Sequence, residues 1–354
     1  MQIHATNING LGASQVVKSF LEALGKSGDL VKYTIFLPET GVLSSFKLEE
    51  GIFIKYRRIL PNAISRFVEC VCSVFFFSNK PTIVLGDIPL RGIKNQIVLV
   101  HQPNLVYPKI NPYSSKKINF RISRFLFAIN HKFAKKIIVQ TGAMAIDLIK
   151  SYPKIKHKVI VSPQPVPNWL NIGLKENHNH SKNNIHFFYP AAFYPHKKHD
   201  FLLKVDKYCR LYTHDMSNIK VWLTLTEDEF KPYESVKWLE NLGRLDTEEM
   251  NNYYNKADAL LFLSSMESYG LPIIEALTIN LPIVVADFSY STWLCEEAVH
   301  YFIPYKEKSF LEALDFQKTD ILSEIKPDYN KIMRKFPNSW VDVVDVFQKA
   351  LLNS

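Results

Sequence analysis

The strongest constraint in this sequence is the alternation of short apolar runs with segments of helical periodicity along almost the whole chain. The apolar runs are continuous, as expected of parallel strands covered by helices on both faces. The alternation stops once, at residues 163–184, which are rich in Pro, Asn and His and therefore typical of a linker with a surface loop. The pattern predicts an α/β protein with two doubly wound, Rossmann-like domains.

The predicted elements follow this division. In the first half the expected strands are Ile3–Thr6, Tyr33–Leu37, Ile52–Tyr56, Thr82–Gly86, Ile97–His101, Lys136–Gln140 and Val159–Val161, and the expected helices are Ser14–Leu24, Ala63–Phe77, Lys117–Phe133 and Gly142–Lys150. In the second half the strands are Ile185–Pro190, Lys220–Leu225, Ala259–Leu263 and Ile283–Ala286, and the helices are Phe201–Leu211, Thr247–Asn255, Leu271–Thr278 and Ser309–Leu314. The predicted domains are 1–165 and 185–336, joined by a linker at 166–184. A helix within 337–354 follows, and the sequence leaves open whether it packs on the first domain or on the second.

The charge is distributed unevenly between these domains. The net charge is +9, but residues 1–165 hold 23 Lys and Arg against 8 Asp and Glu, whereas the remainder is acidic. A basic half indicates either solvated lysines or a partner that is anionic, such as a nucleic acid, a membrane surface or a phosphorylated lipid or sugar. No recognisable nucleic-acid-binding module is present, so we expect no nucleic-acid partner.

Four cysteines in 354 residues show no spacing suited to zinc and form no disulfide framework, which is consistent with a reducing cytosol. The first residues do not resemble a signal peptide. The longest apolar stretch, Phe67 to Phe77, contains Glu69 and is shorter than the roughly 20 residues that span a bilayer. We therefore expect a cytoplasmic protein, peripheral at most to a membrane.

A glycine-containing turn follows the first predicted strand. In Asn9-Gly10-Leu11-Gly12-Ala13-Ser14, the missing Cβ atoms allow close approach of a ligand, and Ala13-Ser14 would open the next helix. The third glycine of a dinucleotide-binding fingerprint is Gln15, so NAD binding is disfavoured. An ordinary tight turn and a loop facing phosphate or sugar both remain open for Gly12.

The most informative motif is Ser-Ser-Met-Glu-Ser-Tyr-Gly-Leu-Pro-Ile-Ile-Glu-Ala-Leu, at residues 264–277. A buried strand is predicted to end just before it, a turn carries Glu267 and Gly270, and Pro272 falls in a first helical turn, where proline is tolerated. Carboxylates accept hydrogen bonds from sugar hydroxyls, and amides at a helix N-terminus bind phosphate. Either carboxylate alone fits a helix cap, but the whole string indicates a sugar- and phosphate-binding pocket.

This string, in which seven residues separate Glu267 from Glu275, resembles the signature of glycosyltransferase family 4, the retaining nucleotide-sugar transferases of the GT-B fold. Collinear segments that extend the resemblance are 242–245, 253–259 and 282–287 in the second half, and 100–104 and 139–141 in the first. The resemblance is dense from about residue 185 to 315 and thinner over 1–165. It implies that two domains face an interdomain cleft where the chemistry takes place.

The resemblance also implies roles for individual residues. Glu267 would bind hydroxyls of the donor sugar, Glu275 those of the ribose, and Lys197 would neutralise the diphosphate leaving group, although a lone lysine in a loop is as often merely solvated. The remaining donor-binding residues that it implies are Gly12, Gly243, Arg244 and the backbone of Ser268, Tyr269, Gly270 and Leu271. His101 would stand beside the donor sugar and the attacking hydroxyl, and without the Gln-Pro-Asn that follows it a structural role would be preferred.

One departure from the family pattern concerns charge. Ala192 occupies the position where the family places an arginine, so Lys198, His196 or a more distant residue would supply the second positive charge, or the leaving group is less well stabilised. No Asp-x-Asp string stands at a strand end, and Asp87 follows its strand alone. We therefore expect a mechanism without metal or cofactor.

The expected activity is transfer of a sugar from a UDP- or GDP-sugar to an acceptor hydroxyl with retention at the anomeric carbon. Lys116 to Lys136, with Phe120, Phe125, Leu126 and Phe127, is predicted to form a basic amphipathic helix. Further basic residues in this half are Arg57, Arg58 and Arg66. An anionic membrane carrying a polyprenyl-diphosphate-linked glycan would suit them as partner. The Glu-x7-Glu string argues against a phosphorylase or an epimerase, and Ala192 leaves open a weakly active, sugar-nucleotide-binding accessory protein.

Overall fold

The structure, a computed structural model, describes all residues except 9–10, 57–61, 73–79, 167–168, 171–183 and 353–354. The chain divides into two compact units, one formed by Met1–Pro165 with Phe336–Ser354 and the other by Val166–Lys335. Both units are parallel-sheet, Rossmann-like α/β domains, as predicted. Most of the predicted linker lies outside the described residues, and the interdomain cleft stays a prediction.

The first unit contains a seven-stranded sheet in its described residues, in the order β3-β2-β1-β4-β5-β6-β7, with every pair parallel. Its strands are β1 (Gln2–His4), β2 (Thr34–Pro38), β3 (Ile52–Tyr56), β4 (Thr82–Val84), β5 (Gln96–Val100), β6 (Ala134–Val139) and β7 (Val159–Val161). Its helices are α1 (Leu11–Lys26), α2 (Asn62–Val71), α4 (Ile118–Asn130), α5 (Gly142–Ser151) and α13 (Trp340–Leu352).

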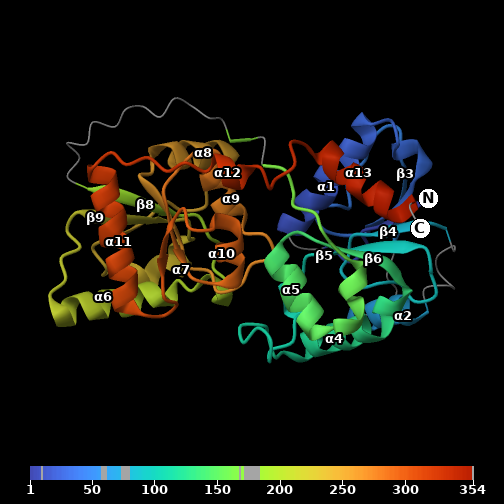
Figure 1. The fold of residues 1–354 in the computed structure, drawn as a ribbon, viewed down its shortest axis with the longest axis horizontal. Coiled ribbons are helices and arrows are strands. Elements are labelled where there is room, and N and C mark those ends of the chain that lie inside the picture. The colour runs from blue at the N-terminus through green and yellow to red at the C-terminus, as the bar shows by residue number, and fades with distance from the viewer. Residues whose placement is uncertain (9–10, 57–61, 73–79, 167–168, 171–183, 353–354) are drawn as a thin grey trace. The chain divides into compact units, whose positions relative to one another are not determined.

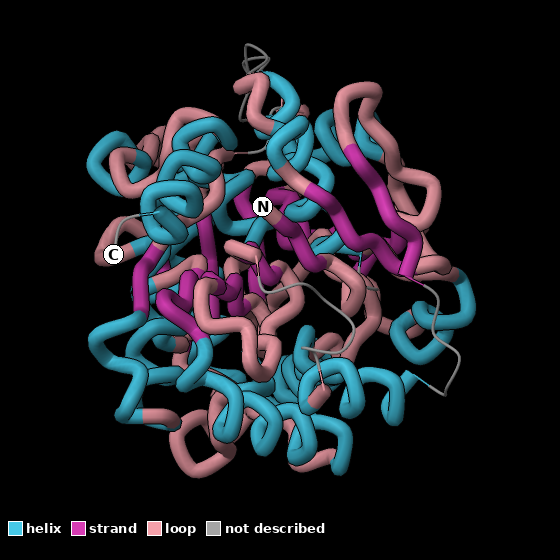
Figure 2. The backbone as a smooth tube through the Cα atoms, turned by 90° about the vertical axis from the view of Figure 1, so that its right-hand side faces the viewer, coloured by secondary structure: helices cyan, strands magenta, loops and turns pink. Residues whose placement is uncertain are grey.

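Helices cover both faces of this sheet (Figures 1 and 2). On one face α1 and α13 pack against strand residues such as Ile35 and Ile97, and on the other α4 and α5 pack against residues such as Val98 and Ile137. The continuous burial of β5 follows from this double cover and explains its apolar sequence.

The last helix of the chain, α13, belongs to the first unit. Its Phe347 ring lies 4.9 Å from that of Phe20 in α1, measured between centroids, and Gln348 donates a hydrogen bond to Asp29 over 2.8 Å. Of the two packing alternatives left open by the sequence, the structure therefore adopts the first.

The second unit contains a six-stranded parallel sheet in the order β10-β9-β8-β11-β12-β13, again for the described residues. Its strands are β8 (Ile185–Tyr189), β9 (Ile219–Leu223), β10 (Leu239–Asn241), β11 (Ala259–Phe262), β12 (Ile283–Ala286) and β13 (His300–Phe302). Its helices are α6 (Asp200–Tyr212), α7 (Glu227–Phe230), α8 (Thr247–Lys256), α9 (Leu271–Thr278), α10 (Ser289–Cys295), α11 (Glu307–Leu322) and α12 (Asn330–Met333).

Three local predictions were wrong. Helix α1 begins at Leu11, so Ser14 lies inside the helix rather than capping it, where it is buried. The expected helix to Phe77 ends at Val71, and residues 73–79 lie outside the described part of the chain. The stretch from Lys116 to Lys136 is not one helix, because Lys135 and Lys136 belong to β6.

Candidate functional site

The predicted donor-binding residues gather at one edge of the second sheet. Strand β8 lies between β9 and β11, so the strand order reverses there, and open α/β sheets bind ligands at such a point. The loops that follow β8 and β11 are tied together, because the Ser265 amide donates to the His196 carbonyl over 2.8 Å. The Ser265 hydroxyl donates to the same carbonyl over 3.1 Å. These bonds bring Lys197 and Glu267, 70 residues apart, side by side.

Lys197 and Glu267 form an ion pair with 2.5 Å between Nζ and Oε1. Their side chains are only 13% and 14% exposed, and Lys197 Nζ lies 5.1 Å from the centroid of the Phe262 ring. The Tyr189 hydroxyl donates to the Lys197 carbonyl and fixes the backbone of this loop. Because each charge compensates the other, both can stay largely buried at the strand ends.

Gly270 is required where the turn enters α9. Its φ of 76° lies in the left-handed region, and a Cβ added there would come within 3.0 Å of Leu294 Cδ1. Pro272 occupies the first turn of the helix, as predicted. Ser268 and Leu271 are half-buried and Tyr269 is buried. The glycine therefore allows the backbone of this turn to lie close to the sheet edge.

Glu275, one turn into α9, is buried and accepts a hydrogen bond from the hydroxyl of Tyr254 in α8. Burial raises the pKa of Glu275 to about 7, and the Tyr254 hydrogen bond and the charge of Lys197 oppose this rise. Tyr254 was not predicted as a partner of Glu275, since the two residues are 21 positions apart in the chain.

The loop after β10 holds two further predicted donor-binding residues. Gly243 has a φ of 77°, and Arg244 NH2 donates to both carboxylate oxygens of Glu229, over 3.0 and 2.8 Å. Glu229 also accepts from the Thr226 amide in a capping box at the start of α7. Arg244 thus links the segments that follow β9 and β10. Glu229 was not predicted from the sequence as the partner of Arg244.

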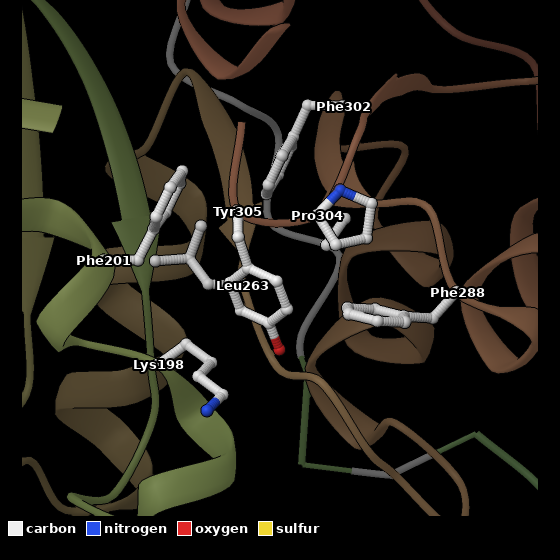
Figure 3. A pocket seen from close by; sticks show the side chains of 8 residues that line it. Lys198, Phe201, Leu263, Phe288, Phe302, Pro304 and Tyr305 are labelled. Atoms are coloured by element: carbon white, nitrogen blue, oxygen red, sulfur yellow. The ribbon is translucent and has the colours of Figure 1, made fainter. Parts of the chain in front are cut away.

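Lys198 has a φ of 59°, which is uncommon for a residue with a side chain. Its Nζ lies 5.5 Å from the centroid of the Tyr305 ring, beside a small pocket that Leu263 and Phe288 also line. Figure 3 shows the Lys198 amine and the Tyr305 hydroxyl reaching toward the same end of this pocket. Burial lowers the pKa of the neighbouring His196, so that imidazole is uncharged at neutral pH.

In the first unit, His101 directly follows β5 and lies beside Asp87, which follows β4. Asp87 Oδ1 accepts hydrogen bonds from the amides of His101 and Gln102, over 2.8 and 2.9 Å. His101 Nε2 lies 3.6 Å from Asp87 Oδ2. The contact between Asp87 and His101 was not predicted, because the sequence does not show that β4 and β5 are neighbours in the sheet.

Arg124 in α4 fastens the segment that follows this histidine. Its guanidinium donates to the carbonyls of Asn104 and Ser115, over 2.9 and 2.5 Å, and the residue is buried. Leu126 and Phe127 are buried as well, so these three residues do not belong to an exposed basic face. The exposed apolar residues of α4 are Ile118, Ile122 and Phe125.

Gly12 lies in the first turn of α1, exposed, with no atom within 4 Å of an added Cβ, and Asn9 and Gly10 lie outside the described residues. Nothing in the described structure brings Gly12 together with the other predicted donor-binding residues. Within the described residues no group of His, Cys, Asp and Glu is arranged to hold a metal ion. No helix in the described part of the chain is long and apolar enough to cross a bilayer.

Part of the sequence of the second unit matches a known protein family. Residues 173–316 match the family model of glycosyl transferases, group 1. Over 243 residues the chain is 25% identical to the O-antigen chain mannosyltransferase RfbU of Salmonella typhimurium, a match that covers 67% of this chain and 65% of that protein. The chain thus spans slightly less than two thirds of this relative.

Solved structures extend the likeness over the whole chain. HepE of Anabaena, solved in complex with UDP and glucose, has a TM-score of 0.67 at 13% identity, covering 100% of this chain and 99% of that one. WaaG, a glycosyltransferase involved in lipopolysaccharide biosynthesis, has a TM-score of 0.61 at 12% identity, covering 100% and 95%. The two sheets and these structures show two Rossmann-like domains of the GT-B type, and the family match lies within the second unit.

Proposed function

We propose that this chain is a retaining glycosyltransferase of the family 4 type, which moves a hexose from a UDP- or GDP-sugar to a hydroxyl of a glycan. The observation that carries the proposal is the Lys197–Glu267 pair beside Gly270 and α9, inside the segment that matches the family model. This arrangement offers a cation for a diphosphate and a carboxylate for sugar hydroxyls at one point of the sheet edge. The HepE structure with UDP supports a nucleotide-sugar donor.

In the proposed reaction Glu267 exchanges its bond to Lys197 for bonds to hydroxyls of the donor sugar, and Glu275 accepts hydrogen bonds from the ribose. Lys197, once released, faces the diphosphate, whose negative charge grows as the glycosidic bond breaks. Amides of Ser268 to Leu271 bind the same group. The acceptor hydroxyl attacks from the face that the diphosphate leaves and gives its proton to the departing phosphate oxygen, while His101 orients the attack. The protein supplies positioning and electrostatics.

Lys198 is our candidate for the positive charge that Ala192 does not supply. It follows Lys197 directly and carries an amine, whereas burial lowers the pKa of His196. No ion pair with a carboxylate is found for Lys198 among the described contacts, so its amine is not already neutralised. A lysine in a left-handed conformation is a form of backbone strain that tends to occur at functional sites.

The acceptor is proposed to be a glycan on a polyprenyl diphosphate, a precursor of a surface polysaccharide, at the cytoplasmic face of the inner membrane. The similarity to an O-antigen chain mannosyltransferase of Salmonella typhimurium supports a glycan as the acceptor. On α4, Ile118, Ile122 and Phe125 recur at helical spacing and are exposed, with Lys117 and Arg121 beside them. Apolar side chains between cations suit the interface of an anionic membrane.

The first test is donor binding followed by transfer. The nucleotide or sugar nucleotide that binds should raise the melting temperature of the full chain, so UDP, GDP, UDP-glucose and GDP-mannose are compared. Transfer is then measured with a lipid-linked glycan in detergent. Lys197→Ala and Glu267→Ala should each lower kcat by on the order of 10³-fold. Lys207→Ala, an exposed lysine of α6, is the matched control and should retain activity.

The accessory-protein alternative predicts a different result. Ala192 favours it, because one cation fewer at the diphosphate weakens leaving-group stabilisation. Wild-type protein that binds a sugar nucleotide but transfers sugar to no lipid-linked or soluble glycan would support the alternative and overturn the transferase.

A further inference from the structure

The loop that carries His101 is fixed by a single carboxylate. Asp87 is only 7% exposed, and its Oδ1 accepts the amide hydrogens of both His101 and Gln102. Hydrogen bonds from two backbone amides stabilise a buried carboxylate and, in return, fix the two peptide units that donate them. The second oxygen, Oδ2, faces the His101 ring at 3.6 Å from Nε2. Asp87 therefore contacts both the backbone and the side chain of the histidine.

The backbone of Asp87 is turned to make these contacts possible. Its φ is 68°, in the left-handed region, which aspartate, asparagine and glycine adopt more readily than other residues. The Asp87 amide donates to the Leu99 carbonyl of β5 over 3.2 Å, and the Ile88 amide donates to the Gly86 carbonyl over 2.8 Å. These bonds hold the turn against the end of β5. Backbone conformation alone would favour glycine at this position, so the carboxylate accounts for the aspartate.

The hydrogen bonds continue beyond the histidine. The Gln102 side chain accepts from the Asn104 amide over 3.3 Å, and the Asn104 carbonyl accepts from the buried Arg124. The segment from His101 to Asn104 is thus held at one end by Asp87 and at the other by α4. Between these ends, His101 Nδ1 is buried and has no hydrogen-bond partner among the residues that the structure describes. Of the two ring nitrogens, Nε2 is therefore the one that faces a described partner, Asp87 Oδ2.

We infer that Asp87 is the positioning residue for His101: it fixes the peptide units of the loop through Oδ1 and the orientation of the imidazole through Oδ2. The inference rests on the proposed function in that His101 acts in sugar transfer. It does not make Asp87 a catalytic residue, because the carboxylate reaches the reaction only through the histidine.

Two substitutions separate the two contacts. Asp87→Gly removes the carboxylate and leaves the two amides without their acceptor, but glycine accepts the left-handed backbone, so the variant should fold with a modest loss of stability. Asp87→Asn retains an oxygen acceptor for the two amides but removes the negative charge that faces the ring. Asp147→Asn, the same chemical change at a half-buried site in α5 of the same unit, is the matched control.

Amide hydrogen exchange of the full chain measures how firmly the amides of this loop are held, and it does not require enzymatic activity. Asp87→Gly should increase exchange at His101 and Gln102, whereas Asp87→Asn and Asp147→Asn should leave it near the wild-type rate. In the transfer assay Asp87→Gly should lower kcat by on the order of 100-fold with an unchanged KM for the donor, because the donor residues lie in the second unit. Asp87→Asn should show a smaller loss in kcat, again without a change in KM.

Unchanged exchange at His101 and Gln102 in Asp87→Gly, or full kcat in this variant, would overturn the inference. So would an equal loss of kcat in Asp147→Asn, since that would reflect a general weakening of the unit. If the wild-type protein transfers no sugar, the proposed function fails, and the exchange experiment still decides whether Asp87 fixes the loop.

Discussion

The two loops with the predicted catalytic residues are held in different ways. In the first unit the loop after β5 is fixed by its own backbone amides, which donate to Asp87. In the second unit the loop after β8 presents Lys197, whose amine is held by a side-chain ion pair with Glu267. In the proposed reaction the donor breaks the ion pair of the second loop and leaves the hydrogen bonds of the first loop intact. On the proposed function, the first unit holds its catalytic residue in place, and the second unit exchanges one partner of its catalytic residues for another.

The largest effect on stability is expected at Glu275, which belongs to the exchanging unit. The unfolded chain has the ordinary pKa of 4.5 for this group, and burial raises the folded value to about 7. The folded protein therefore retains a proton between these values, so stability falls as pH rises through this window and the full cost is present above pH 7. Glu275→Gln, which mimics the protonated form, should be more stable than wild type at pH 8 by up to about 3 kcal/mol.

Urea unfolding at pH 8 and at pH 4.5 measures this difference, which should shrink toward zero at the lower pH. The same variant should bind the sugar nucleotide less tightly, since the amide offers a weaker acceptor to ribose hydroxyls. A Glu275→Gln protein that is equally destabilised at both pH values would contradict the assigned cause of the shift.

A smaller effect is expected at the exposed face of α4. Phe125→Glu replaces an exposed aromatic ring with a charge that anionic lipid repels, and it should weaken binding to vesicles by about 10-fold. Cosedimentation with vesicles containing anionic phospholipid measures the change, and phosphatidylcholine vesicles serve as the control surface. Phe316→Glu, at an exposed position of α11 in the second unit, is the matched variant. Equal losses of vesicle binding in the two variants would contradict a membrane contact at α4.

The smallest effect is expected at Lys198 in the second unit. Like Asp87 in the first unit, it has a left-handed backbone conformation. Lys198→Gly relieves the backbone and should raise the free energy of unfolding by about 0.5–1 kcal/mol. If Lys198 supplies the second cation, kcat should nevertheless fall by about 10-fold, so stability and activity change in opposite directions. Denaturant unfolding and the transfer assay on one preparation test both. Undiminished kcat would remove Lys198 from the proposed leaving-group site.

The sequence predicted all seven strands of the first unit but not β10 or β13 of the second. It predicted the turn from Glu267 to Pro272 for a physical reason. Glu267, Gly270 and Pro272 encode their structure locally, since a strand end, a left-handed glycine and a helix start follow one another within a few residues. Two contacts were not predicted, namely that of His101 with Asp87 and that of Glu275 with Tyr254. Each depends on which strands or helices are neighbours in the fold, and one sequence does not show this.

The amphipathic pattern of α4 illustrates the same limit. Cations and aromatic residues alternate along Lys116–Lys136, but periodicity does not say which face the core takes. Arg124, Leu126 and Phe127 are buried in the core. Burial of Arg124 is possible because its guanidinium donates hydrogen bonds to two carbonyl groups. Phe125, predicted in the same set, points outward.

The return of α13 to the first unit has a consequence for how the chain is made. Val344, Phe347 and Leu351 complete a core whose other members, such as Phe20 and Leu24, are synthesised more than 300 residues earlier. The ribosome releases all of 166–335 before this helix emerges, so the second unit can finish folding while the first still lacks part of its cover. A finished first unit is therefore made only by chains that have already translated the whole second unit.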